Sequence, residues 1–96
     1  MPKRILLIDD EISLAAALKF RLSAAGYAVA TASDGPSGID KAAQWRPDVI
    51  LLDMRMPGMD GLDVCRAMKG SEDLLDIPVI VMSANVRDEA RRSALS

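Results

Sequence analysis

The 96-residue sequence predicts an α/β fold, a doubly wound parallel sheet with helices on both faces. Two observations predict it. Short apolar runs alternate along the chain with longer segments of helical periodicity, in the order β-α-β-α-β-α-β-α. Three of the four runs are almost continuously apolar, which is typical of parallel strands covered on both faces. Because crossovers between parallel strands are right-handed, this order builds one sheet sandwiched by helices.

The expected strands are rich in β-branched residues, and turn-forming or charged residues bound each of them. They are Ile5 to Ile8, Ala28 to Ala32, Val49 to Leu52 and Val79 to Met82. The second strand is the least apolar and contains Thr31, so we expect it at an edge of the sheet.

The first expected helix covers residues 11–25 and stops at Gly26, a residue suited to the left-handed conformation just past a helix end. Its inward stripe is expected to contain Ile12, Ala15, Leu18 and Leu22. The second helix is expected to start with Asp34 or Ser33 as its cap, with Pro36 in the first turn, and to end at Arg46-Pro47.

The inward residues of the second helix are expected to be Ile39, Ala42 and Ala43. The third helix is expected to begin at Asp60 or Gly61 and to end at Gly70-Ser71. Its apolar side is expected to contain Leu62, Val64 or Cys65, and Met68. A fourth helix is expected after Asn85.

Composition excludes several classes of function. A net charge of -2 and a pI near 4.9 argue against a nucleic-acid partner, because proteins that track phosphates cluster Lys and Arg. The absence of histidine excludes His-based triads and His-based metal sites, and the single cysteine, Cys65, excludes an internal disulfide. No apolar run is long enough for a signal segment or a membrane span, so we expect a cytoplasmic chain with no membrane partner.

Polar side chains follow three of the expected strands. Asp9 and Asp10 follow the first strand, Asp53 follows the third, and Ser83 follows the fourth. In open α/β sheets, ligands bind beyond the carboxyl ends of the strands. If the first and third strands are neighbours, three carboxylates meet there, and each like-charge pair costs about 4 kcal/mol at about 4 Å. A divalent cation removes that cost, and Mg²⁺ is the natural candidate because it takes hard oxygen ligands.

Simpler explanations exist for each acid taken alone. Asp9 or Asp10 could cap the following helix, and Asp53 could start a turn by bonding its own backbone. Neither explains acids at the ends of two separate buried strands together with a hydroxyl group at a third.

Three stretches, ILLIDDE, VILLDMRMPGMDG and IPVIVMSA, together resemble the receiver domain of two-component response regulators, and their order and spacing fit over the whole chain. The resemblance implies one domain, residues 1–96, with a flavodoxin-like fold and the strand order 2-1-3-4. It also implies a phosphoacceptor signalling domain in a phosphorelay, not an enzyme in the usual sense. Such a domain takes a phosphoryl group from a sensor histidine kinase or a phosphotransfer protein, and it assists its own phosphorylation and dephosphorylation.

The resemblance assigns roles to individual residues. Asp53 would be the phosphoacceptor, and Ser83 would be the switch hydroxyl that turns toward the acyl phosphate and repositions the following helix. Mg²⁺ would be held by Asp9, Asp10, Asp53 and the backbone carbonyl of Arg55. The residues expected to support the phosphoryl loop are Met54, Pro57, Gly58 and Ala84.

The sequence departs from the family at its carboxyl end. The family continues into a fifth strand, which ends in a lysine that grips the phosphoryl group, and into a fifth helix; the 96 residues end before both. We therefore expect a C-terminally truncated receiver whose last strand is an exposed edge. We also expect a homo-oligomer through that edge, formed by dimerisation or by exchange of elements.

Two other functions stay open on the sequence. Without the family lysine, the chain could be a receiver-like assembly or interaction module that does not switch. A Mg²⁺-dependent phosphatase would use the same carboxylates, but it usually needs a second acid close behind the nucleophile, where this chain has Met54 and Arg55.

Overall fold

The computed structural model describes residues 2–53 and 61–82, in which strands and helices alternate. The elements are β1 (Arg4–Ile8), α1 (Ile12–Ala24), β2 (Ala28–Ala32), α2 (Gly35–Trp45), β3 (Val49–Asp53), α3 (Gly61–Lys69) and β4 (Val79–Met82). The predicted order is confirmed through β4, and each predicted strand is found within one residue of its expected ends. The helix predicted after Asn85 lies outside the described residues.

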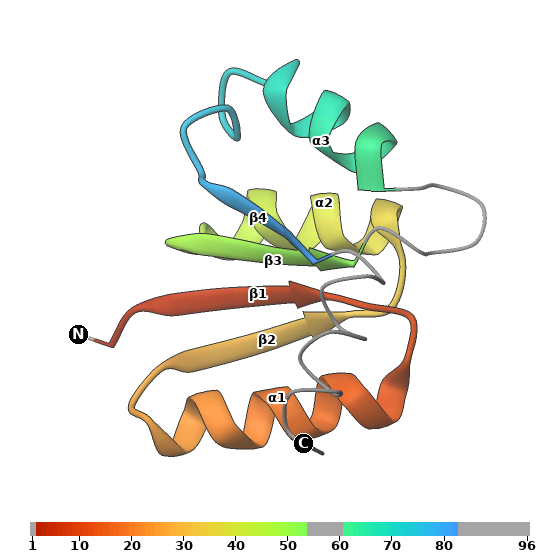
Figure 1. Ribbon diagram of the computed structural model, residues 1–96. Helices are drawn as coiled ribbons and strands as arrows, with labels where there is room; N and C mark the ends of the chain where they lie inside the picture. Colours follow the sequence, from red (N-terminus) through yellow and green to blue (C-terminus); the bar gives the residue numbers. More distant parts are fainter. Residues whose placement is uncertain (1, 54–60, 83–96) are drawn as a thin grey trace.

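The sheet is parallel, with the strand order β2-β1-β3-β4 (Figure 1). This order confirms the doubly wound α/β fold and places β2 at an edge, as expected from its composition. Ile8 of β1 pairs with Ala32 of β2 on one side and with Leu52 of β3 on the other. The carboxyl ends of these three strands are therefore level at one edge of the sheet.

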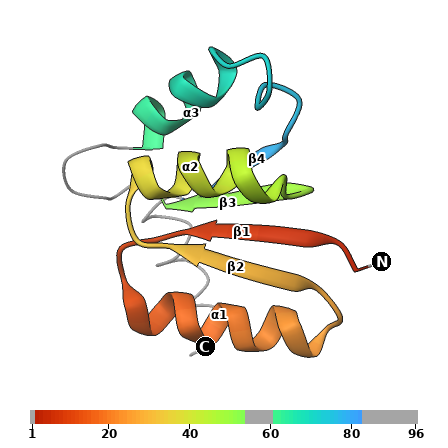
Figure 2. The ribbon, with the colours of Figure 1, turned by 180° about the vertical axis from the view of Figure 1, so that it is seen from behind.

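The helices divide between the two faces of the sheet. α1 lies on one face, and α2 and α3 lie on the other (Figure 1 and Figure 2). The main core fills the space beneath α2 and α3, where each buried aliphatic side chain stabilises the fold by about 1.5–3 kcal/mol. Its buried members are Leu6, Ile8, Ala42, Ile50, Leu52, Val64, Met68, Leu74 and Ile77. This core fixes the position of β1 and β3, which carry the acidic residues.

α2 packs closely against β1 at Gly38. A Cβ atom on Gly38 would lie 2.4 Å from Cδ1 and 2.8 Å from Cγ1 of Ile8, so a side chain at this position would force Ile8 to shift. Glycine therefore lets the helix approach the strand at the residue that directly precedes the acidic pair.

The start of α2 is the one predicted. Asp34 is the N-terminal cap, its carboxylate accepts a hydrogen bond of 2.7 Å from the backbone N–H of Ser37, and Pro36 lies in the first turn. The bonds from the Ser37 amide and hydroxyl hold the pKa of Asp34 below its usual value. The helix ends at Arg46, which adopts the left-handed conformation with φ 55°.

Replacing Asp34 by alanine is expected to lower the Tm at neutral pH and to lower it progressively less in acid. A lowered pKa means that the capping carboxylate stabilises the fold above the unfolded value of 3.8, and that this contribution is lost as the pH falls through the folded pKa. Thermal unfolding between about pH 7 and about pH 3 measures the difference in Tm between the parent and the variant. Asp40→Ala, at an exposed position of the same helix, is the control. If the difference in Tm between the parent and Asp34→Ala does not become smaller in acid, the capping role is contradicted.

Three residues predicted to face inward are exposed instead, and these predictions were wrong. Ile12 and Leu62 are 76% and 52% exposed, and Ala43 is also exposed. Ile12 and Leu62 lie in the first turns of α1 and α3. In α2 the inward side is set by Gly38 and Ala42, four residues apart, so Ala43 is rotated away from the core.

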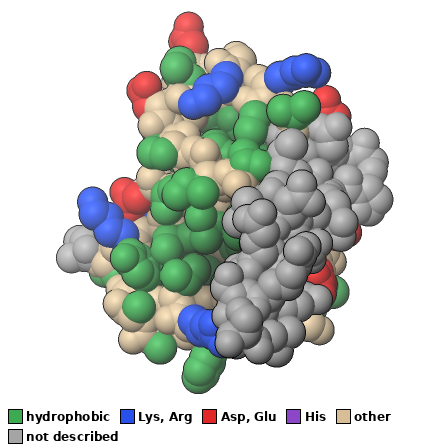
Figure 3. Space-filling model, in the orientation of Figure 1, with side chains coloured by type: hydrophobic (Ala, Val, Ile, Leu, Met, Phe, Trp, Pro, Cys, Tyr) green, Lys and Arg blue, Asp and Glu red, His purple; other side chains and the backbone are tan. Residues whose placement is uncertain are grey.

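The side of the sheet that faces α1 is covered mainly over β1 and β2. Val49 and Leu51 of β3 are only half-buried there, and Ile80 of β4 is 55% exposed. Hydrophobic side chains accordingly gather on the face of the molecule seen in Figure 3. β4 is an edge of the described sheet, as predicted, whereas self-association through this edge stays a prediction.

Within residues 2–53 and 61–82, no helix combines the length and the apolar character needed to cross a membrane.

Candidate functional site

Backbone pairing places Asp9 and Asp53 side by side at the carboxyl edge of the sheet. The Asp9 N–H donates a 3.0 Å hydrogen bond to the carbonyl of Ala32, which continues the pairing of β1 with β2 by one residue. On the other side Ile8 is level with Leu52, so the next residues along, Asp9 and Asp53, are neighbours across β1 and β3. The sheet register therefore brings together acids that are 44 residues apart in the sequence.

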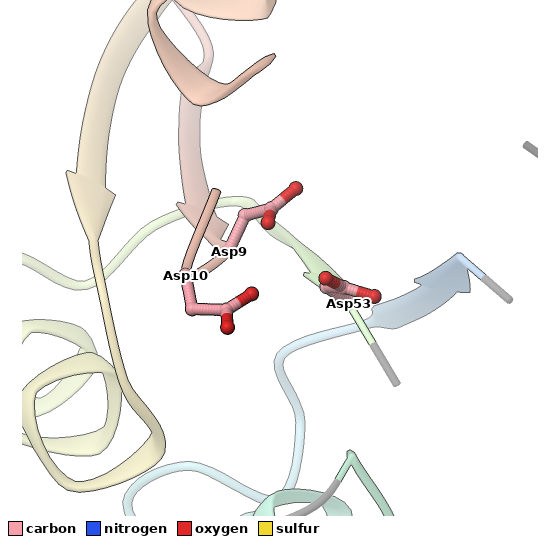
Figure 4. A group of neighbouring side chains, drawn as sticks. All are labelled: Asp9, Asp10 and Asp53. Atoms are coloured by element: carbon pink, nitrogen blue, oxygen red, sulfur yellow. The ribbon is translucent and has the colours of Figure 1, made fainter. Parts of the chain in front are cut away.

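Asp10 completes a cluster of three carboxylates. One carboxylate oxygen from each of Asp9, Asp10 and Asp53 lies within 4.8 Å of the other two. Asp9 and Asp53 are 2% and 1% exposed, whereas Asp10 is open to solvent. Figure 4 shows the three side chains around a common space, two from the chain that follows β1 and one from the end of β3.

The electrostatics of this cluster favour a cation. At an effective dielectric of about 20, two full negative charges at this separation repel by about 3 kcal/mol, and partial burial limits the relief that water provides. A divalent ion among the three oxygens replaces this repulsion with attraction. The donor set consists of carboxylate oxygens alone, with no sulfur or imidazole, and hard cations such as Mg²⁺ bind such a set best. The residues present therefore fit a metal of this class.

Helix capping does not account for the acidic pair. The N-terminal cap of α1 is Glu11, and no side-chain capping bond is formed there. Asp9 instead accepts a 2.9 Å hydrogen bond at Oδ1 from the backbone N–H of Glu11. This bond, two residues along the chain, holds the Asp9 carboxylate at the strand end, and it was missed at the sequence level. The spacing Asp-x-amide of an Asx turn could have indicated it.

The end of β4 lies next to the cluster. Met82, the last residue of β4, is the register partner of Asp53. Ser83 directly follows Met82 in the sequence. Ser83 and Ala84 lie outside the described residues, as do Met54, Arg55, Pro57 and Gly58. The alternative in which Asp53 starts a turn by bonding its own backbone also depends on residues outside the described ranges, because its candidate N–H donors belong to residues 54–60.

Comparison with known proteins agrees with this geometry. Residues 5–96 match the response regulator receiver domain family. The chain is 43% identical over 84 residues to the response regulator MprA of Mycobacterium tuberculosis, an alignment that covers 88% of this chain and 36% of MprA. It is 45% identical over 84 residues to the response regulator PleD of Caulobacter vibrioides, covering 88% of this chain and 18% of PleD. Among solved structures, the chemotaxis response regulator CheY4 of Vibrio cholerae matches with a TM-score of 0.84 and 30% identity, over 96% of this chain and 77% of CheY4.

The extent of these matches differs between the proteins. The chain spans about a third of MprA and about a fifth of PleD, whereas it spans most of CheY4. The family match itself begins at the first residue of the predicted first strand and runs to the end of the printed sequence. With the sheet order and the acidic cluster, this match shows that the chain belongs to the response regulator receiver domain family.

Proposed function

We propose that this chain is a phosphoacceptor domain of a two-component phosphorelay, and that Asp53 receives the phosphoryl group. The observation that carries the proposal is the cluster of three carboxylates at the ends of two neighbouring strands, two of them buried. Burying acids at one point costs stability, and a site for a cation and a phosphoryl group gives that arrangement a use. Membership of the receiver family, whose domains act in signalling, supports the same conclusion.

The proposed chemistry is a transfer of one phosphoryl group. A carboxylate oxygen of Asp53 attacks the phosphorus atom, a new P–O bond forms, and the bond between phosphorus and the donor breaks with its electron pair leaving on the donor. Phosphoryl transfer needs mainly positioning and charge neutralisation from a protein. Asp9, Asp10, Asp53 and the Arg55 carbonyl would hold Mg²⁺, which when bound supplies that neutralisation. The chain itself holds the buried Asp53 carboxylate at the end of β3.

The proposed readout of phosphorylation is a switch at the end of β4. An aspartyl phosphate carries about -1.5 to -2 charge, enough to attract a hydroxyl group and move the adjoining segment. Ser83 follows the residue paired with Asp53, which supports its role as the switch hydroxyl with Ala84 as its small neighbour. The phosphoryl donor is proposed to be a sensor histidine kinase or a phosphotransfer protein, in line with the response regulators that the chain resembles.

The test of this function is the incorporation of phosphate from a small acyl phosphate. Incubation with acetyl phosphate and Mg²⁺ is expected to add one phosphoryl group, seen as an increase in intact mass that hydroxylamine removes, because hydroxylamine cleaves acyl phosphates. Peptide mapping after reduction of the acyl phosphate should place it on Asp53. A stable phosphate on a serine or threonine, or none at all with Mg²⁺ present, would overturn the proposal.

Mg²⁺ is expected to stabilise the fold. Asp10→Asn should raise the stability measured without Mg²⁺ and should reduce the stabilisation that Mg²⁺ provides. At about one hundred times its Kd, a bound ion adds about 2.7 kcal/mol to the free energy of unfolding. Removing the Asp10 charge relieves repulsion, so without Mg²⁺ the variant should be more stable than the parent by up to about 1 kcal/mol, the exposure of Asp10 limiting the gain. Thermal melts with Mg²⁺ and with excess EDTA measure both effects.

The control for that measurement is Asp40→Asn, which removes an exposed carboxylate on α2, outside the acidic cluster. It should leave the Mg²⁺ response at the parental size. A parental Mg²⁺ response in Asp10→Asn would show that the ion binds elsewhere.

A further inference from the structure

The contact between Gly38 of α2 and Ile8 of β1 lies one residue away from the acidic cluster. Both residues are buried, and Ile8 has no exposed surface. A Cβ atom on Gly38 would meet three carbon atoms of Ile8, at 2.4, 2.8 and 3.3 Å, so either the helix or the isoleucine must move to admit it. Asp9 and Asp10 directly follow Ile8 in the sequence. The position of α2 and the position of the strand end are therefore linked.

The first route from this contact to the acids runs through β1. Ile8 belongs to an inner strand, which pairs with β2 on one side and with β3 on the other. Its side chain is part of the aliphatic core, and protein cores contain few voids into which a displaced side chain can turn. A displacement of the Ile8 side chain is therefore passed in part to its backbone. The next residue along that backbone is Asp9, which contributes one carboxylate to the cluster.

The second route runs through α2. The Gly38 N–H donates a 3.0 Å hydrogen bond to the carbonyl of Asp34, the residue that caps this helix. Two residues before Asp34, the carbonyl of Ala32 accepts the 3.0 Å hydrogen bond from the Asp9 N–H. If α2 retreats from β1 to admit a side chain at position 38, it pulls on its short connection to β2 and so on the carbonyl that Asp9 uses. Movement of the strand and movement of the helix thus both reach Asp9.

Displacement of one carboxylate affects some divalent ions more than others. One oxygen from each of Asp9, Asp10 and Asp53 lies within 4.8 Å of the other two (Figure 4). Mg²⁺ is small and demands nearly ideal octahedral geometry, with oxygen ligands at about 2.0–2.1 Å. Ca²⁺ accepts about six to eight oxygen ligands at about 2.3–2.6 Å in a flexible arrangement. Moving Asp9 from its place should therefore weaken the binding of Mg²⁺ more than the binding of Ca²⁺.

We propose that Gly38 is a positioning residue for the metal site. By letting α2 contact Ile8 closely, it holds Asp9 in a place that suits a small octahedral cation, and it thereby sets the preference of the site for Mg²⁺ over Ca²⁺. Glycine has no side chain with which to bind an ion, so Gly38 acts through Ile8 and through the Ala32 carbonyl. The inference rests on the proposed metal site, and it adds to that site a residue of α2 that no pattern of carboxylates in the sequence indicates.

The first test measures the dissociation constants of Mg²⁺ and Ca²⁺ for the parent chain and for Gly38→Ala, from the shifts of the backbone amide NMR signals of residues 9–11 during titration. Mg²⁺ binding should weaken by about tenfold or more, the usual effect of losing a residue that orients a ligand. Ca²⁺ binding should weaken by less than about threefold. An unchanged Mg²⁺ affinity, or a loss for Ca²⁺ as large as that for Mg²⁺, overturns the proposal while leaving the phosphoacceptor function intact. A parent that binds neither ion overturns both.

Ile77→Val is the matched control for a general loss of core packing. Ile77 is buried in the same core as Ile8, but it precedes β4 and so lies toward the edge of the sheet opposite the acids. The substitution should lower the Tm and leave the ratio of the two dissociation constants at its parental value. Circular dichroism at the temperature of the titration establishes that each variant is folded. If Ile77→Val changes this ratio as much as Gly38→Ala does, loss of packing explains the effect and the proposal fails.

The second test is rescue through Ile8. Ile8→Val removes Cδ1, the atom nearest to the Cβ that alanine adds at position 38, and keeps Cγ1. The double variant should therefore bind Mg²⁺ at least about threefold more tightly than Gly38→Ala alone, yet more weakly than Ile8→Val alone. A double variant that binds Mg²⁺ no better than Gly38→Ala overturns the proposal. If Gly38→Ala alone does not fold, the double variant is compared with Ile8→Val, and an equal ratio of the Mg²⁺ and Ca²⁺ dissociation constants in these two chains overturns it as well.

Discussion

Replacing Asp53 by asparagine is expected to abolish phosphate incorporation while leaving the chain folded. The amide side chain has nearly the shape of the carboxylate, but it lacks the anionic oxygen that would attack phosphorus. Intact mass measured after incubation with acetyl phosphate and Mg²⁺ should show one added phosphoryl group on the parent and none on the variant. Asp40→Asn is the control and should be labelled like the parent, because Asp40 is an exposed residue outside the acidic cluster.

The same substitution has a second signature that concerns stability. Asp53 is 1% exposed and shares the cluster with Asp9 and Asp10, so its charge is repelled by two neighbours in the absence of metal. Without Mg²⁺, Asp53→Asn should raise the free energy of unfolding by about 1–3 kcal/mol, below the full repulsion because Asp10 is exposed and solvent screens its charge. Urea denaturation with EDTA measures this change.

These two signatures separate the role of the acid from a general effect on folding. A variant that is labelled as well as the parent would show that another residue accepts the phosphoryl group. A variant that is destabilised without metal would show that the Asp53 carboxylate makes net stabilising contacts, and the argument from repulsion would fail.

Replacing Gly38 by alanine is expected to destabilise the fold by about 2 kcal/mol, although alanine is the better helix former by about 1 kcal/mol. The added Cβ would overlap Cδ1 and Cγ1 of Ile8, and the surrounding core leaves the isoleucine little space in which to move. For a domain of this size, the loss corresponds to a fall in Tm of about 8–16 °C. Thermal and urea unfolding measure it, with Gln44→Ala, at an exposed position of the same helix, as the control.

A double variant distinguishes overlap from other causes. Ile8→Val removes Cδ1, the atom nearest to the added Cβ, but keeps Cγ1, so in that background Gly38→Ala should still cost stability but less than in the parent. If the two substitutions are additive instead, the cost of Gly38→Ala does not come from contact with Ile8.

The elements of this fold were predictable from the sequence because local patterns and tertiary packing agree. The strand Val49–Asp53 is apolar until its final carboxylate, and α2 begins at a capping aspartate followed by a proline, so both ends are marked by residue type. Helix faces were less predictable. Ile12 and Leu62 have apolar side chains at helical spacing, yet both are exposed, because helical spacing alone does not say which residues of a helix reach the core.

The acidic site was predictable in its membership and less so in its detail. Asp9, Asp10 and Asp53 stand out because charge directly follows buried strands, and parallel strands align their carboxyl ends. The hydrogen bond from the Glu11 amide to Asp9 depends on a turn geometry that many Asp-containing loops do not adopt. Ile12 was predicted to belong to the buried stripe of α1 but is 76% exposed, because the helical pattern does not say which side meets the sheet.

The sequence by itself determined the alternation of strands and helices, the aliphatic core and the identity of the acids that follow β1 and β3, since periodicity, capping residues and charge are local properties. Only the tertiary structure decided that one carboxylate oxygen from each acid lies within 4.8 Å of the others, that Gly38 lets α2 approach Ile8, and that Ile12 and Phe20 project into solvent. These properties depend on strand register and helix orientation. Both are set by contacts between residues far apart in the chain, so no local pattern contains them.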